Sequence, residues 1–237
     1  MTASFSFRRT VIALLLIAGC TSTKELDASK LRIIFFGDSI TQMGNDPGGY
    51  VSLVRDSLRS FGPQYEVIGA GISGNKVSDL ERRLQKDVLD KKPNIVVIYI
   101  GINDVWHYQF ADRGLTGTPK DSFEIKLRGI VSAIQRSGAK VILCTPSVIG
   151  EKKEGGNSWD TMLDDYSAVS RKVAGDEAAG LLDLRNNFTL FLKEHNPKNL
   201  EKGILTTDGV HLNSEGNRFV ADLMIQAISS TAGIPSR

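Results

Sequence analysis

The sequence predicts a doubly wound α/β fold, in which helices cover both faces of one parallel β-sheet. The first observation is that short apolar runs, rich in β-branched residues, alternate along the chain with longer segments whose apolar residues recur at helical spacing. The second is that the strand-like runs are continuously apolar, which is typical of strands buried on both faces. Right-handed crossovers through the helices would join such strands in parallel.

Each expected strand is a short apolar run bounded by polar or turn-forming residues. Residues 31–36 form the first strand, and residues 95–100 form the clearest one, Ile-Val-Val-Ile-Tyr-Ile, with Pro93 shortly before it. The remaining strands are expected at residues 65–69, 140–145 and 181–184. Among doubly wound sheets we predict the flavodoxin-like strand order 2-1-3-4-5, which opens a ligand crevice between the carboxyl ends of strands 1 and 3.

The expected helices show apolar residues three or four positions apart. In residues 77–89 these are Val77, Leu80, Leu84 and Val88. Similar spacing predicts helices at residues 50–60, 123–137, 162–173 and about 214–228, with Gly138 closing the 123–137 helix.

Composition indicates a single globular body. The 237 residues are 41% hydrophobic and 24% charged, and no linker, repeat or low-complexity tract divides residues 31–237, which we expect to form one domain. The formal charge of +2 comes from Arg8 and Arg9; without them, 27 basic residues face 27 acidic ones. A nucleic-acid partner, which would need a basic face, is therefore not expected.

Residues 1–19 are expected to be a signal peptide. Arg8 and Arg9 supply a positive start, and residues 11–18 are apolar but too short to span a bilayer. The sequence Leu-Ile-Ala-Gly-Cys at 16–20 resembles the bacterial lipobox, which implies cleavage before Cys20 and lipidation of its thiol. Residues 20–30 would then be the lipidated cysteine and a polar tether.

The lipobox resemblance implies a protein held to a membrane of the bacterial cell envelope through Cys20. Thr21 follows the cysteine where the usual inner-membrane retention signal has Asp, so the outer membrane, on its periplasmic or surface side, is the expected location. The alternative is an ordinary secretory peptide cleaved nearby, with Cys20 incidental. Cys144 lies in an apolar run and is expected to be a buried small hydrophobe without a disulfide partner.

Polar residues that suit ester cleavage follow the first three expected strands. Such chemistry needs a nucleophile, a base, a group that orients the base, and donors for the oxyanion. Ser39 follows strand 1 and can be the nucleophile, with its own backbone N–H as one oxyanion donor. The backbone N–H of Gly74 after strand 2 and the side chain of Asn103 after strand 3 can supply the others. By itself, Ser39 is also compatible with a turn or a helix N-cap.

His211 is the candidate base, because Asp208 stands three residues earlier and can fold back to accept a hydrogen bond from the imidazole. Asp208-Gly209 is also a common turn dipeptide, so another acceptor for His211 stays open. Of the two other histidines, His195 is expected at a solvated helix end. Asp38 is expected to be a structural hydrogen-bonding residue. No cluster has metal-ligand spacing, and neither a metal nor a cofactor is expected.

Four sequence blocks, taken in order, resemble the GDSL, or SGNH, hydrolase family. The matching residues are Gly37-Asp38-Ser39-Ile40, Gly74, Gly101-Ile102-Asn103-Asp104 and Asp208-Gly209-Val210-His211. The resemblance implies Ser39, Asp208 and His211 as catalytic residues, with Ser39, Gly74 and Asn103 forming the oxyanion hole. It also implies a three-layer α/β/α fold, the SGNH hydrolase fold, over residues 31 to about 228. Ile40 replaces the Leu that gives the family its name.

The segment after Asn103 is rich in aromatic residues and is expected to form one wall of the substrate pocket. Trp106, His107 and Tyr108 are candidate substrate contacts, with packing of the rings onto the body as the alternative. The loop at residues 150–158 follows strand 4 and is a candidate for the opposite wall.

These features together predict a serine esterase acting through an acyl-enzyme. The resemblance favours short acyl groups, and an envelope location favours O-acetyl groups on carbohydrates, with no obligate protein partner. Alternatives of the same family are a thioesterase, a lysophospholipase, a short-chain arylesterase or an acyltransferase. From other classes, a non-catalytic carbohydrate-binding lipoprotein and a phosphate-cradling loop at residues 37–41 stay open, although the latter leaves Asp208 and His211 without a role.

Overall fold

The computed structural model describes residues 1, 30–62, 64–153 and 155–233. The predicted signal peptide from residue 2 onward, Cys20 and the tether up to residue 29 lie outside the described residues. Within the described part of the chain, none of the helices has both the length and the apolar character needed to cross a membrane.

Five parallel strands form one sheet in the order β2-β1-β3-β4-β5, so the predicted flavodoxin-like order is confirmed. The strands are β1 (Leu31–Gly37), β2 (Tyr65–Gly71), β3 (Ile95–Tyr99), β4 (Lys140–Cys144) and β5 (Gly180–Leu182). The last one ends earlier than predicted. Asp183 caps the following helix by accepting a hydrogen bond from the backbone N–H of Asn186, and Leu184 is therefore the first residue of that helix and not the end of a strand.

Helices of two kinds connect the strands and follow the last one. The α-helices are α1 (Ser39–Gly44), α2 (Tyr50–Arg59), α3 (Val77–Asp87), α4 (Ile102–Trp106), α5 (Lys120–Arg136), α6 (Asp160–Asp176), α7 (Leu184–His195) and α8 (Ser214–Ala232), and the 3₁₀ helices are η1 (Leu89–Lys91) and η2 (His107–Arg113). The sequence does not predict α1 and α4, because helices of six and five residues are too short to show a 3.6-residue period.

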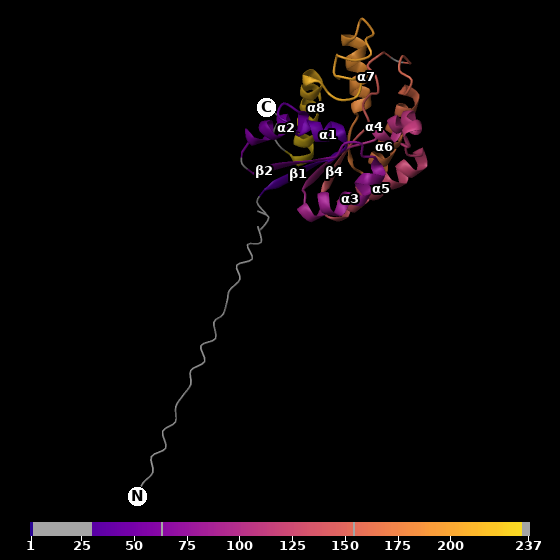
Figure 1. Ribbon diagram of the computed structural model, residues 1–237. Coiled ribbons are helices and arrows are strands. Elements are labelled where there is room, and N and C mark those ends of the chain that lie inside the picture. The colour runs from indigo at the N-terminus through magenta and orange to yellow at the C-terminus, as the bar shows by residue number, and fades with distance from the viewer. Residues whose placement is uncertain (2–29, 63, 154, 234–237) are drawn as a thin grey trace.

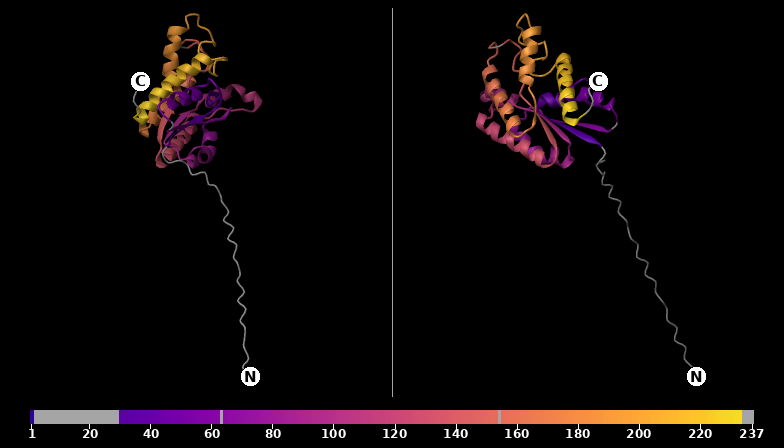
Figure 2. Two further views of the ribbon diagram at one scale, coloured as in Figure 1. Left: turned by 90° about the vertical axis from the view of Figure 1, so that its left-hand side faces the viewer. Right: turned by 180° about the vertical axis from the view of Figure 1, so that it is seen from behind.

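The sheet is the middle of three layers (Figures 1 and 2). Helices α2 and α8 pack together over one face, and α3, α5 and α6 cover the other. Helix α7 joins α8 through an edge-to-face contact of Phe188 and Phe219, with ring centroids 5.5 Å apart. Residues 33–36 of β1 are fully buried and residues 95–98 of β3 nearly so, and these two neighbouring strands lie within a core that residues of the covering helices complete. The predicted α/β/α fold is thus confirmed.

The carboxyl ends of the central strands stop at the same level. Gly37, at the end of β1, pairs with Gly71 on β2 and with Tyr99 on β3. A Cβ atom on Gly37 would lie 2.2 Å from Thr41 Oγ1 and 2.4 Å from the Tyr99 carbonyl oxygen, so only glycine fits here. The segments that follow these strands therefore start side by side on one edge of the sheet.

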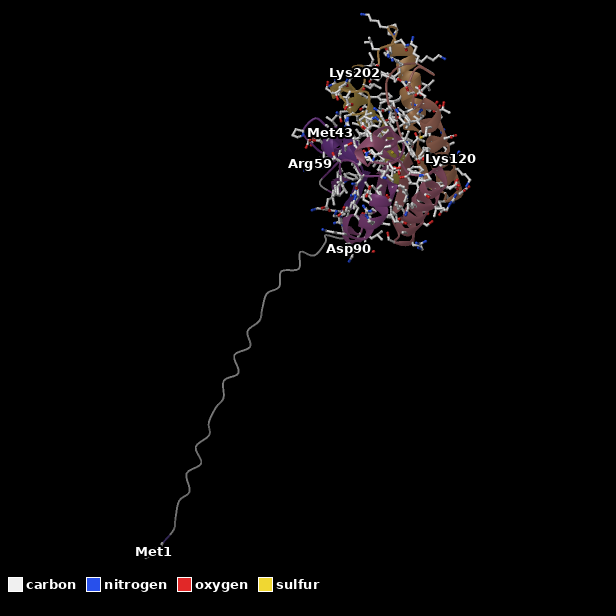
Figure 3. All side chains as sticks on the ribbon, turned by 45° about the vertical axis from the view of Figure 1, so that its right-hand side comes forward. Met1, Met43, Arg59, Asp90, Lys120 and Lys202 are labelled. Carbon is white, nitrogen blue, oxygen red and sulfur yellow. The ribbon has the colours of Figure 1, made fainter. Side chains whose placement is uncertain are left out.

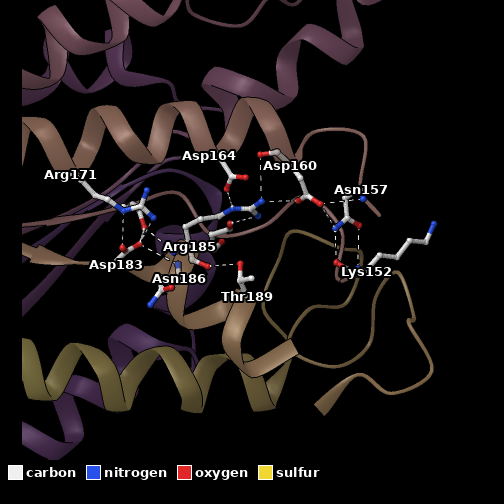
Figure 4. A network of polar contacts seen from close by, with 11 residues as sticks. Lys152, Asn157, Asp160, Asp164, Arg171, Asp183, Arg185, Asn186 and Thr189 are labelled. Carbon is white, nitrogen blue, oxygen red and sulfur yellow. Dashed lines mark hydrogen bonds and ion pairs between the residues drawn. The ribbon is translucent and has the colours of Figure 1, made fainter. Parts of the chain in front are cut away.

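Helices α6 and α7 are joined by a buried cation (Figure 4). Arg185 is 6% exposed, and its Nη2 atom lies 2.9 Å from Asp160 Oδ1 while its Nε atom lies 2.7 Å from Asp164 Oδ1. Its Nη1 atom also donates to the Ser147 carbonyl oxygen at 3.2 Å. A pocket of about 550 Å³ lies beside this cluster, and Lys152, Lys153, Gly155 and Asn157 of the loop predicted to form a pocket wall line it. The predicted catalytic and oxyanion-hole residues do not.

We predict that Arg185→Met lowers the free energy of unfolding by about 3 kcal/mol, because removing one member of a buried ion pair leaves the partner charge uncompensated. Lys120→Met is the matched control, since Lys120 is at the surface (Figure 3) and its nitrogen lies 3.5 Å from exposed Asp165. That variant should cost less than about 1 kcal/mol. Urea unfolding measures both, and equal losses would contradict the prediction.

Candidate active site

Three of the sequence-predicted residues form a hydrogen-bonded chain at the carboxyl edge of the sheet. The Oγ atom of Ser39 lies 2.9 Å from Nε2 of His211, and Nδ1 of the same ring lies 2.7 Å from Oδ2 of Asp208. Ser39 is the first residue of α1, directly after β1, while Asp208 and His211 belong to the loop that precedes α8. The structure thus joins groups that are 172 residues apart.

The loop around His211 is a tight turn closed by its own polar groups. Asp208 Oδ1 accepts hydrogen bonds from the backbone N–H groups of Val210 and His211, at 2.9 and 2.8 Å. Burial opposes ionisation of Asp208, but the hydrogen bonds from the His211 side chain and from these two backbone groups outweigh it and lower the pKa of the carboxyl. An ionised Asp208 can only accept, so Nδ1 of His211 carries a proton, and in the neutral imidazole Nε2 is then the nitrogen that can accept from Ser39.

The predicted oxyanion donors lie on the segments that follow the first three strands. The backbone N–H of Ser39, at the first position of α1, has no intrahelical acceptor. Asn103 is 4% exposed, and its amide nitrogen donates one proton to the carbonyl oxygen of Asn75 at 3.1 Å, which leaves its second N–H for another acceptor. Gly74 lies between these groups in sequence and has φ +75°, a conformation that favours glycine.

Three of the hydrogen bonds made by the turn at residues 72–75 attach it to the end of β1, to α1 and to α4. The backbone N–H of Ile72 donates to the Gly37 carbonyl oxygen at 3.2 Å, and that of Ser73 donates to Gln42 Oε1 on α1 at 2.6 Å. The bond from Asn103 to the Asn75 carbonyl oxygen is the third. The end of β1, the start of α1, the turn and α4 are therefore one connected unit that carries the nucleophile and the three candidate donors.

Two buried carboxyl groups lie on the same edge. Asp38 is 2% exposed and, as the sequence suggests, has a structural bond: it accepts from the backbone N–H of Ile40 at 3.0 Å and caps α1. Burial raises its pKa to about 7, against the opposing effect of that hydrogen bond. Asp104 accepts from the backbone N–H of Val77, and burial raises its pKa to about 6. At neutral pH, Asp38 is therefore partly protonated.

The aromatic segment after Asn103 divides into two parts. The Trp106 ring lies edge-on to the His211 imidazole, with centroids 6.3 Å apart. Tyr108 instead lies against Gly117, where an added Cβ would be 2.1 Å from the tyrosine ring. His107 is half-buried, and burial lowers its pKa, assisted by the charge of Lys76. Substrate contact by these three residues stays a prediction.

The other residues considered from the sequence, His195 and Cys144, have surroundings that indicate a structural role. His195 is the last residue of α7 and is exposed, as predicted, with its ring stacked on Phe191. Cys144 is fully buried, which confirms the expectation from its apolar run, and burial strongly raises the pKa of its thiol. Within the described ranges, no group of three or more His, Cys, Asp or Glu side chains could hold a metal ion.

Sequence reasoning missed two residues that support the site. Arg83 on α3 donates from Nη2 to the Gly37 carbonyl oxygen at 2.7 Å and from Nε to Asn75 Oδ1 at 2.8 Å. Glu151, in the loop after β4, is fully buried against the segment before Asp208. The only signal for Glu151 is a charged residue two positions after the apolar pair Val148-Ile149, with Gly150 between them. Arg83 gives no signal, because its place in the pattern is that of a polar helix position.

The fold is that of the three-layer α/β/α SGNH hydrolases, a class of ester hydrolases. The chain belongs to the GDSL-like lipase/acylhydrolase family, whose model matches residues 35–219. The chain is accordingly a carboxylic ester hydrolase. The predicted boundaries at residues 19, 30 and 31 lie outside this match and stay predictions.

Similar proteins act on acetyl esters. An acetylxylan esterase of Geobacillus stearothermophilus is 31% identical over 214 residues, which are 83% of this chain and 93% of the relative. Among solved structures, the acetyl xylan esterase AlAXEase is 48% identical with a TM-score of 0.80, over 83% of this chain and 99% of that one. Two catalytic mutants of Axe2, an acetylxylan esterase from G. stearothermophilus, replace a serine and a histidine by alanine; each is 30% identical over 84% of this chain and 94% of theirs, with TM-scores of 0.73 and 0.74.

The raised pKa of Asp38 predicts a specific dependence of stability on pH. An unfolded Asp loses its proton near pH 4 whereas folded Asp38 keeps it until about pH 7, so the folded state binds the extra proton in this window and stability falls as pH rises through it. Asp38→Asn keeps the acceptor for Ile40 but cannot ionise. Urea unfolding between pH 4 and 7.5 should show a steeper loss for the wild type than for this variant, and parallel curves would show that Asp38 ionises as readily as in the unfolded chain.

Proposed function

We propose that this protein is an acetyl esterase that removes short acyl groups, above all O-acetyl groups, from carbohydrates through a Ser39–His211–Asp208 acyl-enzyme mechanism. The observation that carries the proposal is the continuous chain from Ser39 Oγ to His211 Nε2 at 2.9 Å and from Nδ1 to Asp208 at 2.7 Å. Both distances are within the range in which a base takes a nucleophile's proton and a carboxylate orients that base.

In the first half of the reaction, His211 Nε2 takes the hydroxyl proton as Ser39 Oγ attacks the ester carbonyl carbon. The carbonyl oxygen becomes an oxyanion that accepts hydrogen bonds from the Ser39 and Gly74 backbone N–H groups and from Asn103. Asp208 stabilises the imidazolium that forms. The tetrahedral intermediate then collapses, the bond to the alcohol oxygen breaks, and His211 returns its proton to that oxygen.

In the second half, water replaces the alcohol. His211 Nε2 takes a proton from the water as its oxygen attacks the acyl-enzyme, and the same oxyanion donors stabilise the second intermediate. Collapse releases acetic acid and returns the proton to Ser39 Oγ. The cycle is balanced with one water consumed per ester, and this chain's own residues carry every proton.

The proposed substrate class is supported by the relatives and by the surroundings of His211. This chain matches two acetylxylan esterases, AlAXEase and the enzyme of G. stearothermophilus, over nearly the full length of each. Trp106 is partly exposed beside the imidazole, and an indole face is a suitable surface for a sugar ring. We propose Trp106, with His107 as a secondary contact, as the residue that binds the carbohydrate part of the substrate.

We further propose that the enzyme is anchored to the cell envelope by a lipid on Cys20, with residues 20–30 as the tether. The support is the lipobox-like sequence at 16–20. Release of the wild-type full chain from membranes by detergent only, and of Cys20→Ala without detergent, would support the anchor. Equal partition of the two would contradict it.

The mechanism predicts different losses of esterase activity in two variants of the protein. With p-nitrophenyl acetate, Ser39→Ala should remove measurable turnover, because no other residue forms the acyl-enzyme. Asn103→Ala should lower kcat about 10²–10³-fold, which is the usual effect of removing one oxyanion donor. Rates with p-nitrophenyl butyrate and octanoate should decline with chain length. A Ser39→Ala variant as active as the wild type would refute the mechanism.

The substrate proposal predicts that Trp106→Leu changes KM for a carbohydrate ester but not for a small aryl ester. Loss of the indole should raise KM for acetylated xylooligosaccharides several-fold, measured as acetate release, with little change in KM for p-nitrophenyl acetate. Phe61→Leu, away from the catalytic edge, is the control. An equal change in KM for both substrates would show that Trp106 only packs around His211. If the wild type releases no acetate from xylooligosaccharides, they are not its substrate.

A further inference from the structure

Glu151 is a fully buried carboxylate that accepts four hydrogen bonds from one short segment. Its Oε2 atom accepts from the backbone N–H of Ile204 at 2.7 Å, and its Oε1 atom accepts from the backbone N–H of Leu205 at 2.7 Å. Oε1 also accepts from Thr206 twice, from the backbone N–H at 2.6 Å and from the hydroxyl at 2.8 Å. In the described part of the chain, no Lys, Arg or His forms an ion pair with Glu151.

The segment that donates these hydrogen bonds to Glu151 has little regular structure of its own. Residues 201–213 form neither a helix nor a named strand, and a single antiparallel bridge joins Thr206 to Leu212. Buried backbone N–H groups need acceptors, and an ionised carboxylate can satisfy several of them with stronger, charge-assisted bonds. Glu151 therefore supplies this segment with the hydrogen-bond acceptors that the backbone of a neighbouring strand would otherwise supply.

The main chain beside Glu151 makes further bonds to the same part of the molecule. The backbone N–H of Glu151 donates to the Glu201 carbonyl oxygen at 2.8 Å, and its carbonyl oxygen accepts from Nδ2 of buried Asn196 at 2.8 Å. The backbone N–H of Gly150 donates to the Gly209 carbonyl oxygen, also at 2.8 Å. The loop after β4 is thereby bonded to the segment that precedes the Asp208 turn and to Gly209 within that turn.

Thr206 connects Glu151 to that turn directly. Its hydroxyl donates to Glu151 and accepts from the backbone N–H of Gly209 at 3.1 Å. The backbone N–H of Thr207 donates to the His211 carbonyl oxygen at 2.8 Å, which closes the turn between these contacts. The position of the Asp208–His211 pair therefore depends on where Glu151 holds residues 204–206.

We propose that Glu151 is a positioning residue of the catalytic machinery, which holds the turn so that Nε2 of His211 reaches Ser39 Oγ. The inference rests on the proposed function, since it assigns Glu151 a role in the Ser39–His211–Asp208 reaction. Displacement of a catalytic group by about 1 Å can cost on the order of a hundredfold in rate, so a carboxylate that never touches substrate can still govern kcat.

Glu151→Gln is the sharpest test, because the amide keeps the size of the side chain. Its oxygen can take the place of Oε1, but its NH₂ group then faces the N–H of Ile204, so one hydrogen bond is replaced by a repulsion between donors. With p-nitrophenyl acetate, kcat should fall at least tenfold while KM stays within about twofold. Glu201→Gln is the matched control: it alters an exposed carboxylate of the same segment, paired with Lys152, and should leave kcat unchanged.

A second readout reports the His211–Asp208 bond without turnover. The proton in a short imidazole–carboxylate hydrogen bond gives a separate, far-downfield NMR signal. This signal should be present in the wild type and in Glu201→Gln, and broadened or lost in Glu151→Gln, at a temperature where circular dichroism shows all three to be folded. If Glu151→Gln does not fold, Thr206→Val, which removes only the hydroxyl between Glu151 and Gly209, should show the same losses in smaller degree.

The outcomes separate this proposal from the proposed function. A folded Glu151→Gln, or in its absence Thr206→Val, that keeps both wild-type kcat and the downfield signal overturns the positioning role. A rise in KM with kcat unchanged, or an equal fall of kcat in Glu201→Gln, overturns it as well. If the wild type hydrolyses no ester, the proposed function fails, and the NMR signal alone then decides: its retention in the variant refutes the positioning of His211 by Glu151, and its loss supports it.

Discussion

The close approach of three strand ends at Gly37 is the constraint on which the rest of the site depends. Because β1, β2 and β3 stop at the same level, the Gly37 carbonyl oxygen can accept from both Ile72 and Arg83, while Ser39 begins α1 only two residues later. The nucleophile and the turn that carries Gly74 are therefore anchored to one atom. A side chain at Gly37 would push the end of β1 away from Tyr99. The nucleophile and the turn that carries Gly74 would then shift together.

The site consists of two halves that reach the same edge by different means. The half with Ser39, Gly74 and Asn103 follows directly from the ends of β1, β2 and β3, and the close packing of buried β1 and β3 leaves it little freedom. The half with Asp208 and His211 lies in a loop before α8, 172 residues from Ser39 in the case of the imidazole. Such a loop needs bonds of its own, and the contacts of Gly150 and Glu151 provide them from the end of β4.

Buried carboxylates at this edge are satisfied by backbone N–H groups, and not by cations. Asp38 accepts from Ile40, Asp104 from Val77, and Glu151 from residues 204–206. Arg185, by contrast, joins α6 to α7 through ion pairs with Asp160 and Asp164 beside a separate pocket. Backbone donors are held rigidly by the fold, so they position a carboxylate and the segment bonded to it with little loss of side-chain entropy. This suits an edge where small displacements affect chemistry.

The sequence by itself determined the parallel sheet, its strand order and which residues could form the site, because apolar runs, helical spacing and the four short blocks are local properties of the chain. Only the tertiary structure decided that Ser39 and His211 lie 2.9 Å apart, that Leu184 begins a helix, and that Asn75, Arg83 and Glu151 support the site. The four donors to Glu151 lie 53 to 55 residues away. Partners of a buried polar group are set by packing between distant segments, which no local pattern contains.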